Sequence, residues 1–257
     1  MKIAMLGAGA YGAALGEVLV DNGYTVQYYD ALTRQETLAE VLAGAEMMVL
    51  CVPSQAVPHL LPHLPKDLPM IVATKGILSD QPLAEFKDVM VLSGPGYADD
   101  IKAHKETHLT VTDGRIIKMF GTDYLDFDVT EDVRGVLMCG ALKNVYAILA
   151  GLKALQPGTD EHQQFLDAAA GEMQTILAAN GADPATVNCN CGRGDLKITC
   201  YYPSRNYEFG QKLWENPDYQ PEKTVEGLSA LKRIRRGEIE LPENLPLLEE
   251  LTHAIEC

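Results

Sequence analysis

Lys143 is the one charged residue in an otherwise apolar stretch, residues 135–152 (GVLMCGALKNVYAILAGL), where Asn144 follows it. A lysine buried in an apolar helix is costly unless its charge is needed there. Burial penalises the ammonium and lowers its pKa toward the physiological range, so Lys143 could donate and accept a proton. The alternative is a structural lysine whose stem lies along the helix and whose ammonium reaches water.

Polar residues with complementary chemistry follow later in the chain. Asp195 and Thr199 in GDLKITC are four residues apart, which places them on one face if the segment is helical. Ser204, Arg205 and Asn206 precede or open a further predicted helix. A guanidinium, an amide and free N–H groups at a helix start suit an anion, although a surface arginine that caps a turn is the simpler interpretation.

A glycine-rich turn, GAGAYG, has the spacing G-x-G-x-x-G at Gly7, Gly9 and Gly12. It follows the first predicted strand and opens the first predicted helix, the context in which the motif binds a dinucleotide. Asp30 ends the second predicted strand, about where a carboxylate binds the adenosine ribose. An ordinary strand–helix turn and a mononucleotide or flavin site are the alternatives.

Three further turns follow predicted strands: CVPSQ, ATKGI and SGPGYA. Open α/β sheets bind ligands at the carboxyl ends of their strands, where these turns would lie. Lys75 stands out in ATKGI, and Gly76 beside it permits a sharp bend. Taken alone, the turns are compatible with simple connections, and Lys75 with a solvated side chain.

The first half of the chain alternates strand and helix patterns, which predicts a mostly parallel sheet covered on both faces. After about residue 131 the pattern is helical, with helices expected at 132–155, 161–181, 205–213, 222–237 and 244–255. We therefore expect an α/β fold in which a Rossmann-type, doubly wound parallel sheet (residues 1–131) precedes an all-helical domain (132–257).

The composition narrows the classes of partner. The net charge is −15, which argues against nucleic acid or an anionic membrane and requires local cations for any phosphate substrate. Lys143 and Asn144 interrupt the longest apolar run, so no membrane-spanning segment is expected. The six cysteines lack the paired spacing of a zinc site, so we expect reduced thiols, no metal and a cytoplasmic protein.

These motifs, in order along nearly the whole chain, resemble the NAD(P)-dependent glycerol-3-phosphate dehydrogenase family. The collinear elements are GAGAYG, VPS, ATKG, SGPGYA, GALKN, GEM, GADPAT, GDLKITC, SRN and VEG. The resemblance implies interconversion of sn-glycerol 3-phosphate and dihydroxyacetone phosphate, at an active site between the two domains. It also implies a phosphorylated three-carbon substrate, a place in glycerophospholipid metabolism and a homodimer.

The resemblance also assigns roles to residues. It makes Lys143 the catalytic lysine of the helix and Lys75 the second active-site lysine, in one cluster with Asp195 and Thr199. The substrate-binding residues would be Arg205, Asn206, Ser204, Lys75 and Asn144. The cofactor-binding residues would be Gly7, Gly9, Ala10, Tyr11, Gly12, Asp30, Pro53, Ser54, Lys75, Ala98, Arg205 and Glu226.

Some features depart from the family pattern. The segment between Asp30 and the third strand is short, Gly96 replaces the family's Ser or Thr, and LQPGTDEHQQF replaces a glycine-rich stretch. NAD is the expected cofactor because Asp30 would repel a 2′-phosphate, with NADP the alternative because Arg34 lies nearby. A related hydroxyacid or keto-acid reductase and a non-catalytic dinucleotide-binding regulator are the rival functions.

Overall fold

The computed structural model describes residues 1–33, 35–201 and 204–255. The chain folds into two compact units, Met1–Thr74 with Asp80–Val133, and Lys75–Ser79 with Arg134–Cys257. The sequence-based domains, 1–131 and 132–257, stay a prediction. The fold adds that the short Lys75–Ser79 segment packs with the helices rather than with the sheet.

The first unit contains a seven-stranded sheet in the order β2-β1-β3-β4-β5-β6-β7. All neighbouring strands are parallel except β5 and β6. The mostly parallel sheet expected from the sequence is therefore confirmed. The strands are β1 (Lys2–Leu6), β2 (Thr25–Tyr29), β3 (Met47–Leu50), β4 (Met70–Val72), β5 (Val89–Ser93), β6 (Thr107–Val111) and β7 (Leu125–Val129).

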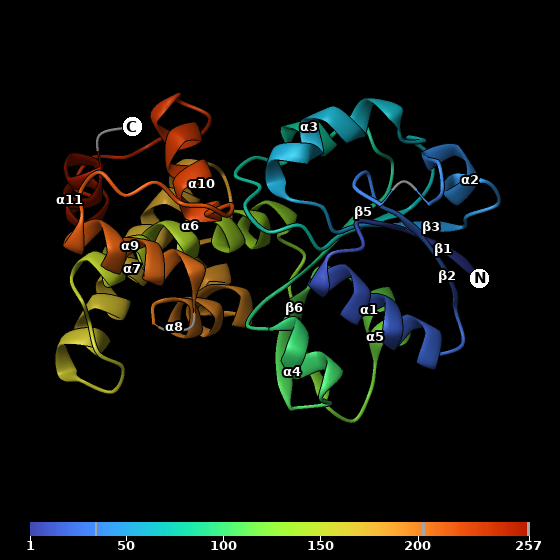
Figure 1. The fold of residues 1–257 in the computed structure, drawn as a ribbon, viewed down its shortest axis with the longest axis horizontal. Coiled ribbons are helices and arrows are strands. Elements are labelled where there is room, and N and C mark those ends of the chain that lie inside the picture. Colours follow the sequence, from blue (N-terminus) through green and yellow to red (C-terminus); the bar gives the residue numbers. More distant parts are fainter. Residues whose placement is uncertain (34, 202–203, 256–257) are drawn as a thin grey trace. The chain divides into compact units, whose positions relative to one another are not determined.

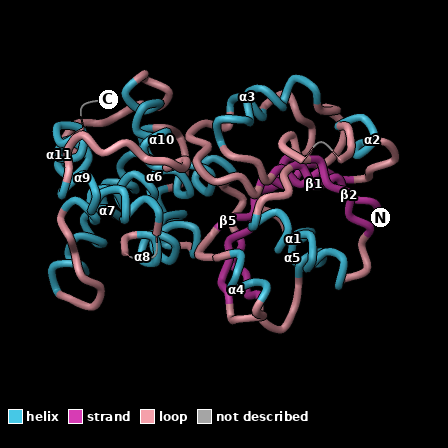
Figure 2. Tube along the Cα trace, in the orientation of Figure 1, coloured by secondary structure: helices cyan, strands magenta, loops and turns pink. Residues whose placement is uncertain are grey.

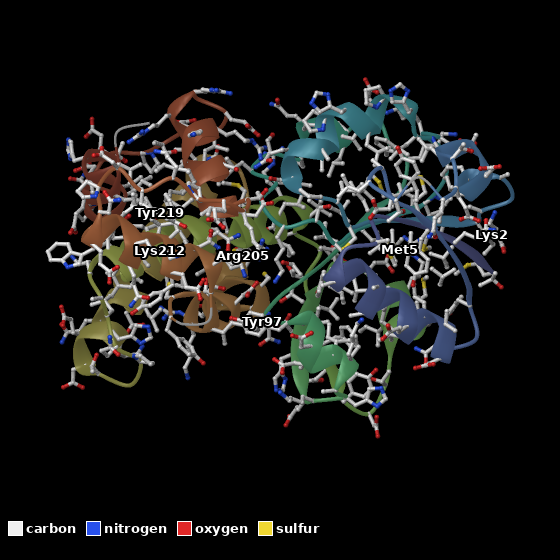
Figure 3. All side chains as sticks on the ribbon, viewed as in Figure 1. Lys2, Met5, Tyr97, Arg205, Lys212 and Tyr219 are labelled. Atoms are coloured by element: carbon white, nitrogen blue, oxygen red, sulfur yellow. The ribbon has the colours of Figure 1, made fainter. Side chains whose placement is uncertain are left out.

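Helices lie on both faces of this sheet. Figure 1 shows α1 and α5 on one side of the strands, with α2 and α3 on the other. The helices of this unit are α1 (Ala10–Asp21), α2 (Leu38–Leu42), α3 (Val57–Leu60), α4 (Ala98–Lys102) and α5 (Gly114–Phe120). Because both faces are covered, β1 carries side chains without exposed surface on both, including Met5, which Figure 3 labels, and Leu6.

The second unit is helical, as expected. Figure 2 shows helices and loops in this part of the chain, and no strand occurs among its described residues. Its helices are α6 (Val133–Leu152), α7 (Asp160–Ala179), α8 (Asp195–Thr199), α9 (Arg205–Glu215), α10 (Glu226–Arg235) and α11 (Pro246–Ala254). Helix α8 was expected only conditionally, through the spacing of Asp195 and Thr199. The 3₁₀ turn Pro184–Asn188 and the π-helical turn Asn190–Gly194 before it were not predicted, because segments this short carry no clear periodicity.

Helix α6 is the central helix of the second unit. Every residue from 135 to 151 is buried, so the helix is enclosed around its whole circumference, and all of these residues are apolar or small except Lys143, Asn144 and Tyr146. By length and hydropathy α6 is a candidate membrane span, but 94% of its most apolar window is buried within the protein. This burial is typical of a core helix.

Glu172 of α7 forms hydrogen bonds with both α6 and α11. Its Oε2 accepts hydrogen bonds from the Tyr146 hydroxyl at 2.9 Å and from Leu248 N at 3.1 Å, and its Oε1 accepts from Leu247 N at 2.6 Å. The carboxylate thus caps the first turn of α11, while desolvation raises its pKa. Glu172 belongs to the GEM motif, but no role for it was predicted from the sequence.

Replacing Glu172 with alanine is expected to lower the free energy of unfolding by about 2–4 kcal/mol, because a buried hydroxyl and two backbone N–H groups would lose their acceptor. Urea unfolding followed by circular dichroism measures this loss. Glu250→Ala is the matched control, since it removes an exposed ion pair with Lys153 and should cost less than about 1 kcal/mol. Equal losses in both variants would show that Glu172 does not act as a buried cap.

Candidate active site

Lys143 lies in the middle of α6 and is only 3% exposed. The alternative in which its ammonium reaches water is therefore wrong. Desolvation lowers the pKa of Lys143 to about 7, Asp195 opposes that shift, and the neighbouring charge of Lys75 adds to it. An amine with a pKa near neutrality can both donate and accept a proton under physiological conditions.

Helix α8 supplies the partners of Lys143. Asp195, 1% exposed, begins this helix, and its Oδ1 forms an ion pair with the Lys143 ammonium. Lys143 Nζ also donates to Thr199 Oγ1 at 3.0 Å, and that hydroxyl donates to the Asp195 carbonyl at 2.6 Å. The spacing of four residues thus places Asp195 and Thr199 on one face of a helix, as predicted.

Lys75 completes the cluster. Its Nζ lies 3.2 Å from Asp195 Oδ2, so the two oxygens of one buried carboxylate contact two different ammonium groups. The Lys75 side chain is 24% exposed, whereas that of Lys143 is 4% exposed. Asp195 therefore orients both lysines, and a substrate oxygen that approached Lys75 and Lys143 would meet two hydrogen-bond donors.

Close helix packing positions the residues beside this cluster. Asn206 Nδ2 donates to Asn144 Oδ1 at 2.8 Å, and Asn206 Oδ1 accepts from Gly227 N at 2.9 Å. A Cβ atom at Gly227 would lie 2.2 Å from the Asn144 carbonyl oxygen, so only glycine allows α10 to approach α6 this closely. This buried network joins α6, α9 and α10. Gly227 was quoted in the VEG motif, but the sequence alone assigned it no role.

The expected anion-binding residues lie at the amino end of α9. Ser204 is the N-cap, and its Oγ accepts from Tyr207 N at 3.5 Å. Arg205 is exposed, and its NH1 lies 3.5 Å from the Thr224 carbonyl oxygen. Arg205 lines a cavity of about 240 Å³ together with Lys212 and Tyr219, and Figure 3 labels these three side chains.

Glu226 is the first residue of α10. Its expected role in cofactor binding stays a prediction.

The glycine-rich turn of the first unit has the geometry of a phosphate cradle. Gly7 has a φ of +114°, and a Cβ atom at Gly12 would lie 2.2 Å from the Gly7 carbonyl oxygen. A Cβ atom at Gly9 would meet no atom within 4 Å, so its backbone borders open space. Gly9 is the N-cap of α1 and makes no side-chain cap, which leaves first-turn N–H groups for a pyrophosphate.

A cavity of about 500 Å³ lies beside this turn and is lined by Ala8, Ala13, Val26, Gln27, Tyr28, Asp30, Thr33, Gln35 and Glu36. Asp30 Oδ1 accepts hydrogen bonds from Leu32 N at 2.7 Å and Thr33 N at 3.3 Å, which fixes the carboxylate at the cavity wall. Both Asp30 and Glu36 are acidic, so the wall suits ribose hydroxyls better than a phosphate. Arg34, expected to favour NADP, lies outside the described residues.

The other expected cofactor residues belong to turns at the same edge of the parallel strands. Ala10 and Tyr11 begin α1, and Pro53 and Ser54 follow β3. Ala98 begins α4 after β5. Their contacts with a cofactor stay predictions. Gly16, which the sequence analysis did not single out, lies in α1 where a Cβ atom would approach the Tyr28 hydroxyl to 1.9 Å, so it lets that wall residue pack on the helix.

The described cysteines and other potential metal ligands are dispersed over the structure. Within the described residues, no three His, Cys, Asp or Glu side chains form a group that could hold a metal ion. None of the five described cysteines forms a disulfide, and three of them, Cys139, Cys191 and Cys200, are buried.

Comparison with known proteins identifies the family. A model of the NAD-dependent glycerol-3-phosphate dehydrogenase N-terminus matches residues 26–115, and the model of the C-terminus matches residues 132–256. A glycerol-3-phosphate dehydrogenase (NAD(P)+) of Pseudomonas aeruginosa is 30% identical, covering 98% of this chain and 89% of the relative. The chain belongs to the glycerol-3-phosphate dehydrogenase family.

Other members of the glycerol-3-phosphate dehydrogenase family agree with this assignment. The enzyme of Desulfotalea psychrophila is 28% identical, covering 99% of this chain and 92% of the relative. The crystal structure of glycerol-3-phosphate dehydrogenase from Coxiella burnetii has a TM-score of 0.83 at 22% identity, covering 99% of this chain and 94% of that one. The shared fold spans both units, so the resemblance read from the motifs is confirmed.

Proposed function

We propose that this chain is an NAD(P)-dependent glycerol-3-phosphate dehydrogenase that interconverts sn-glycerol 3-phosphate and dihydroxyacetone phosphate. The family assignment supports the reaction, and one observation carries it to this chain: the buried cluster of Lys143, Asp195, Thr199 and Lys75. A carbonyl group that accepts a hydride must also receive a proton on its oxygen, and this cluster holds a lysine whose pKa is about 7.

In this proposal Lys143 is the general acid of carbonyl reduction and the general base of alcohol oxidation. Asp195 holds its ammonium in place and, with Thr199, fixes the direction of its remaining N–H bonds. Lys75 presents a second donor beside the same carboxylate, where it would stabilise negative charge that develops on the substrate oxygen. The nicotinamide cofactor, when bound, supplies or accepts the hydride.

The substrate phosphate is assigned to the amino end of α9. Arg205 offers a guanidinium fork, and the first turn of an eleven-residue helix adds N–H groups and partial positive charge. The Asn206 side chain already bonds Asn144 and the Gly227 N–H group, and Asn144 Nδ2 donates to the Gly140 carbonyl oxygen. We therefore assign Asn206 and Asn144 to shaping the site as well as to substrate contact.

The Gly7–Gly12 turn and the Asp30 cavity are assigned to the cofactor. The observation that supports this fit is open space beside Gly9 at the uncapped start of α1. The turn would hold the pyrophosphate, and Asp30 the adenosine ribose. In this scheme residues 1–131 form the dinucleotide-binding domain, and residues 132–257 the substrate domain that completes its site with Lys75.

The direct test is the dihydroxyacetone phosphate-dependent loss of NADH absorbance by the purified protein. We expect turnover with dihydroxyacetone phosphate and little with 2-keto or 3-keto acids of similar size. Turnover of keto acids alone would indicate a related hydroxyacid reductase, and NADH binding without any turnover would indicate a regulator.

NADH is expected to be preferred over NADPH, because Asp30 and Glu36 both border the cavity and would repel a 2′-phosphate. Replacing Asp30 with alanine should narrow the ratio of kcat/KM for the two cofactors, mainly through weaker NADH binding. Fluorescence titrations with NADH and NADPH measure the same change without turnover. A wild-type preference for NADPH would contradict this assignment of Asp30.

The cellular context follows from the same features. The described cysteines form no disulfide, which fits a reducing compartment, and we propose that the protein is cytoplasmic. Its product, sn-glycerol 3-phosphate, would serve glycerophospholipid metabolism. We also propose a homodimer, by analogy with the family, which light scattering coupled to size-exclusion chromatography measures directly.

A further inference from the structure

Arg233 of α10 contacts the backbone next to Lys75. Its NH1 donates to the Gly76 carbonyl oxygen at 2.7 Å, a contact that joins residues 157 positions apart. Gly76 has a φ of +92°, so the chain turns sharply directly after Lys75. Ile77 and Leu78, which follow, are 4% and 0% exposed. The Lys75–Ser79 segment is therefore held in place by the hydrogen bond to the Gly76 carbonyl oxygen and by burial of the Ile77 and Leu78 side chains.

Glu238 holds the Arg233 guanidinium in the orientation that this contact needs. Arg233 Nε donates to Glu238 Oε2 at 2.6 Å, and Arg233 NH2 pairs with Glu238 Oε1. Such a two-point pairing leaves a guanidinium little freedom to rotate, so its remaining nitrogen, NH1, is directed at Gly76. The pair is only 26% and 30% exposed, which limits competition from water.

The position of Lys75 depends on this support. Its ammonium lies 3.2 Å from Asp195 Oδ2, and Lys75 is joined directly to the residue that Arg233 holds. We propose that Arg233 is a positioning residue, which fixes the Gly76 carbonyl and thereby keeps the Lys75 ammonium against Asp195 in the active site. The expected effect on kcat rests on the proposed function, whereas the expected effect on the position of the Lys75 side chain does not.

Displacement of Lys75 would change the protonation of Lys143. The charged groups that shift the pKa of Lys143 are Asp195 and Lys75, while the nearby Cys200 thiol is buried and has its own pKa raised by that burial. The positive charge of Lys75 lowers the pKa of Lys143, whereas Asp195 raises it. If Lys75 moves away, the repulsion weakens and Asp195 pairs with Lys143 alone. Both changes raise the pKa of Lys143.

The pH dependence of kcat reports the protonation of Lys143. Reduction of dihydroxyacetone phosphate needs protonated Lys143, so the wild-type kcat for reduction should fall as the pH rises through about 7. In Arg233→Met the midpoint of this fall should move to higher pH. The same variant should lose about 10- to 100-fold in kcat at pH values below the midpoint, because one donor at the substrate oxygen is misplaced.

Two further variants, Arg233→Lys and Arg235→Met, test whether the effect is specific to the Arg233 guanidinium. Lysine can restore one hydrogen bond to the Gly76 carbonyl but not the paired contact with Glu238, so Arg233→Lys should recover part of the kcat and of the wild-type midpoint. Arg235 lies on the same helix and binds two carbonyl oxygens, of Thr252 and Ile255, away from the cluster. Arg235→Met should therefore keep the wild-type pH profile, even if its melting temperature falls.

A second measurement tests the position of Lys75 without turnover. Competitive lysine acylation, read by mass spectrometry, should show faster labelling of Lys75 in Arg233→Met than in wild type or Arg235→Met. Wild-type labelling and an unshifted pH profile in folded Arg233→Met would overturn the inference, as would equal changes in Arg235→Met. Inactivity of the wild type toward dihydroxyacetone phosphate would instead refute the proposed function, and labelling alone would then decide the role of Arg233.

Discussion

Replacing Lys143 with methionine is expected to lower kcat for dihydroxyacetone phosphate reduction by a factor of about 10²–10⁴, the scale for loss of a general acid. The substitution keeps the volume of the side chain inside α6 and removes its amine. At about pH 8, above the pKa of about 7, Lys143 is mostly neutral in the folded protein, and Lys75 still pairs with Asp195. The melting temperature should therefore change little at this pH, and NADH binding should persist.

Three measurements on one preparation separate chemistry from structure: kcat, NADH affinity and melting temperature. Lys143→Arg should not restore activity, because a guanidinium does not release its proton near neutral pH. Lys153→Met is the matched control, since it removes a lysine just beyond α6 that pairs with Glu250 at the surface. Near-normal kcat in Lys143→Met would contradict the assignment of Lys143 as the proton donor.

Replacing Arg205 with alanine is expected to raise KM for dihydroxyacetone phosphate steeply, with a loss in kcat/KM equivalent to about 2–5 kcal/mol, because the bound phosphate would remove its guanidinium from water and pair with it. The physical reason is that a chain with a net charge of −15 needs local cations to hold a doubly charged phosphate. Steady-state kinetics over a range of substrate concentrations measures the change. Lys212→Ala, in the same cavity, should have a much smaller effect.

Dihydroxyacetone, which lacks the phosphate, distinguishes phosphate binding from other roles of Arg205. Dihydroxyacetone should be a very poor substrate of the wild type, and Arg205→Ala should alter its turnover little because the guanidinium has no phosphate to bind. The ratio of kcat/KM for the two substrates should therefore shrink in the variant. If Arg205→Ala lowered both values equally, Arg205 would act on folding or on the cofactor rather than on the phosphate.

Residues whose position in the fold follows from local sequence were predictable. Gly7, Gly9 and Gly12 were recognised because their spacing reflects one turn between a strand and a helix. Lys143 was recognised because one charge within an apolar run contradicts the pattern around it. Asp195 and Thr199 were placed on one helix face because they are four residues apart. The structure places the three glycines, Lys143, Asp195 and Thr199 in the elements that these local patterns predict.

Residues that act through distant partners were not predictable. Gly227 matters only because α10 approaches the Asn144 carbonyl, and Glu172 only because its carboxylate meets the start of α11. Arg233 lies in KRIRRGE, which by pattern is a solvated helix face, yet it holds Gly76. A single sequence contains no signal for such pairings, because they depend on how helices separated by many residues pack.

The grouping of Lys75–Ser79 with the helices has a consequence for recombination. The cluster of Lys75, Lys143 and Asp195 does not come from one continuous piece of polypeptide, since Lys75 lies in a short segment between two stretches of the first unit. A chimera that joined residues 132–257 to an unrelated dinucleotide-binding domain would inherit Lys143, Asp195 and Arg233 but not the ammonium that shares the carboxylate. We therefore expect a domain exchange at the predicted boundary near residue 131 to keep the proposed reaction only when the new first domain supplies a lysine in place of Lys75.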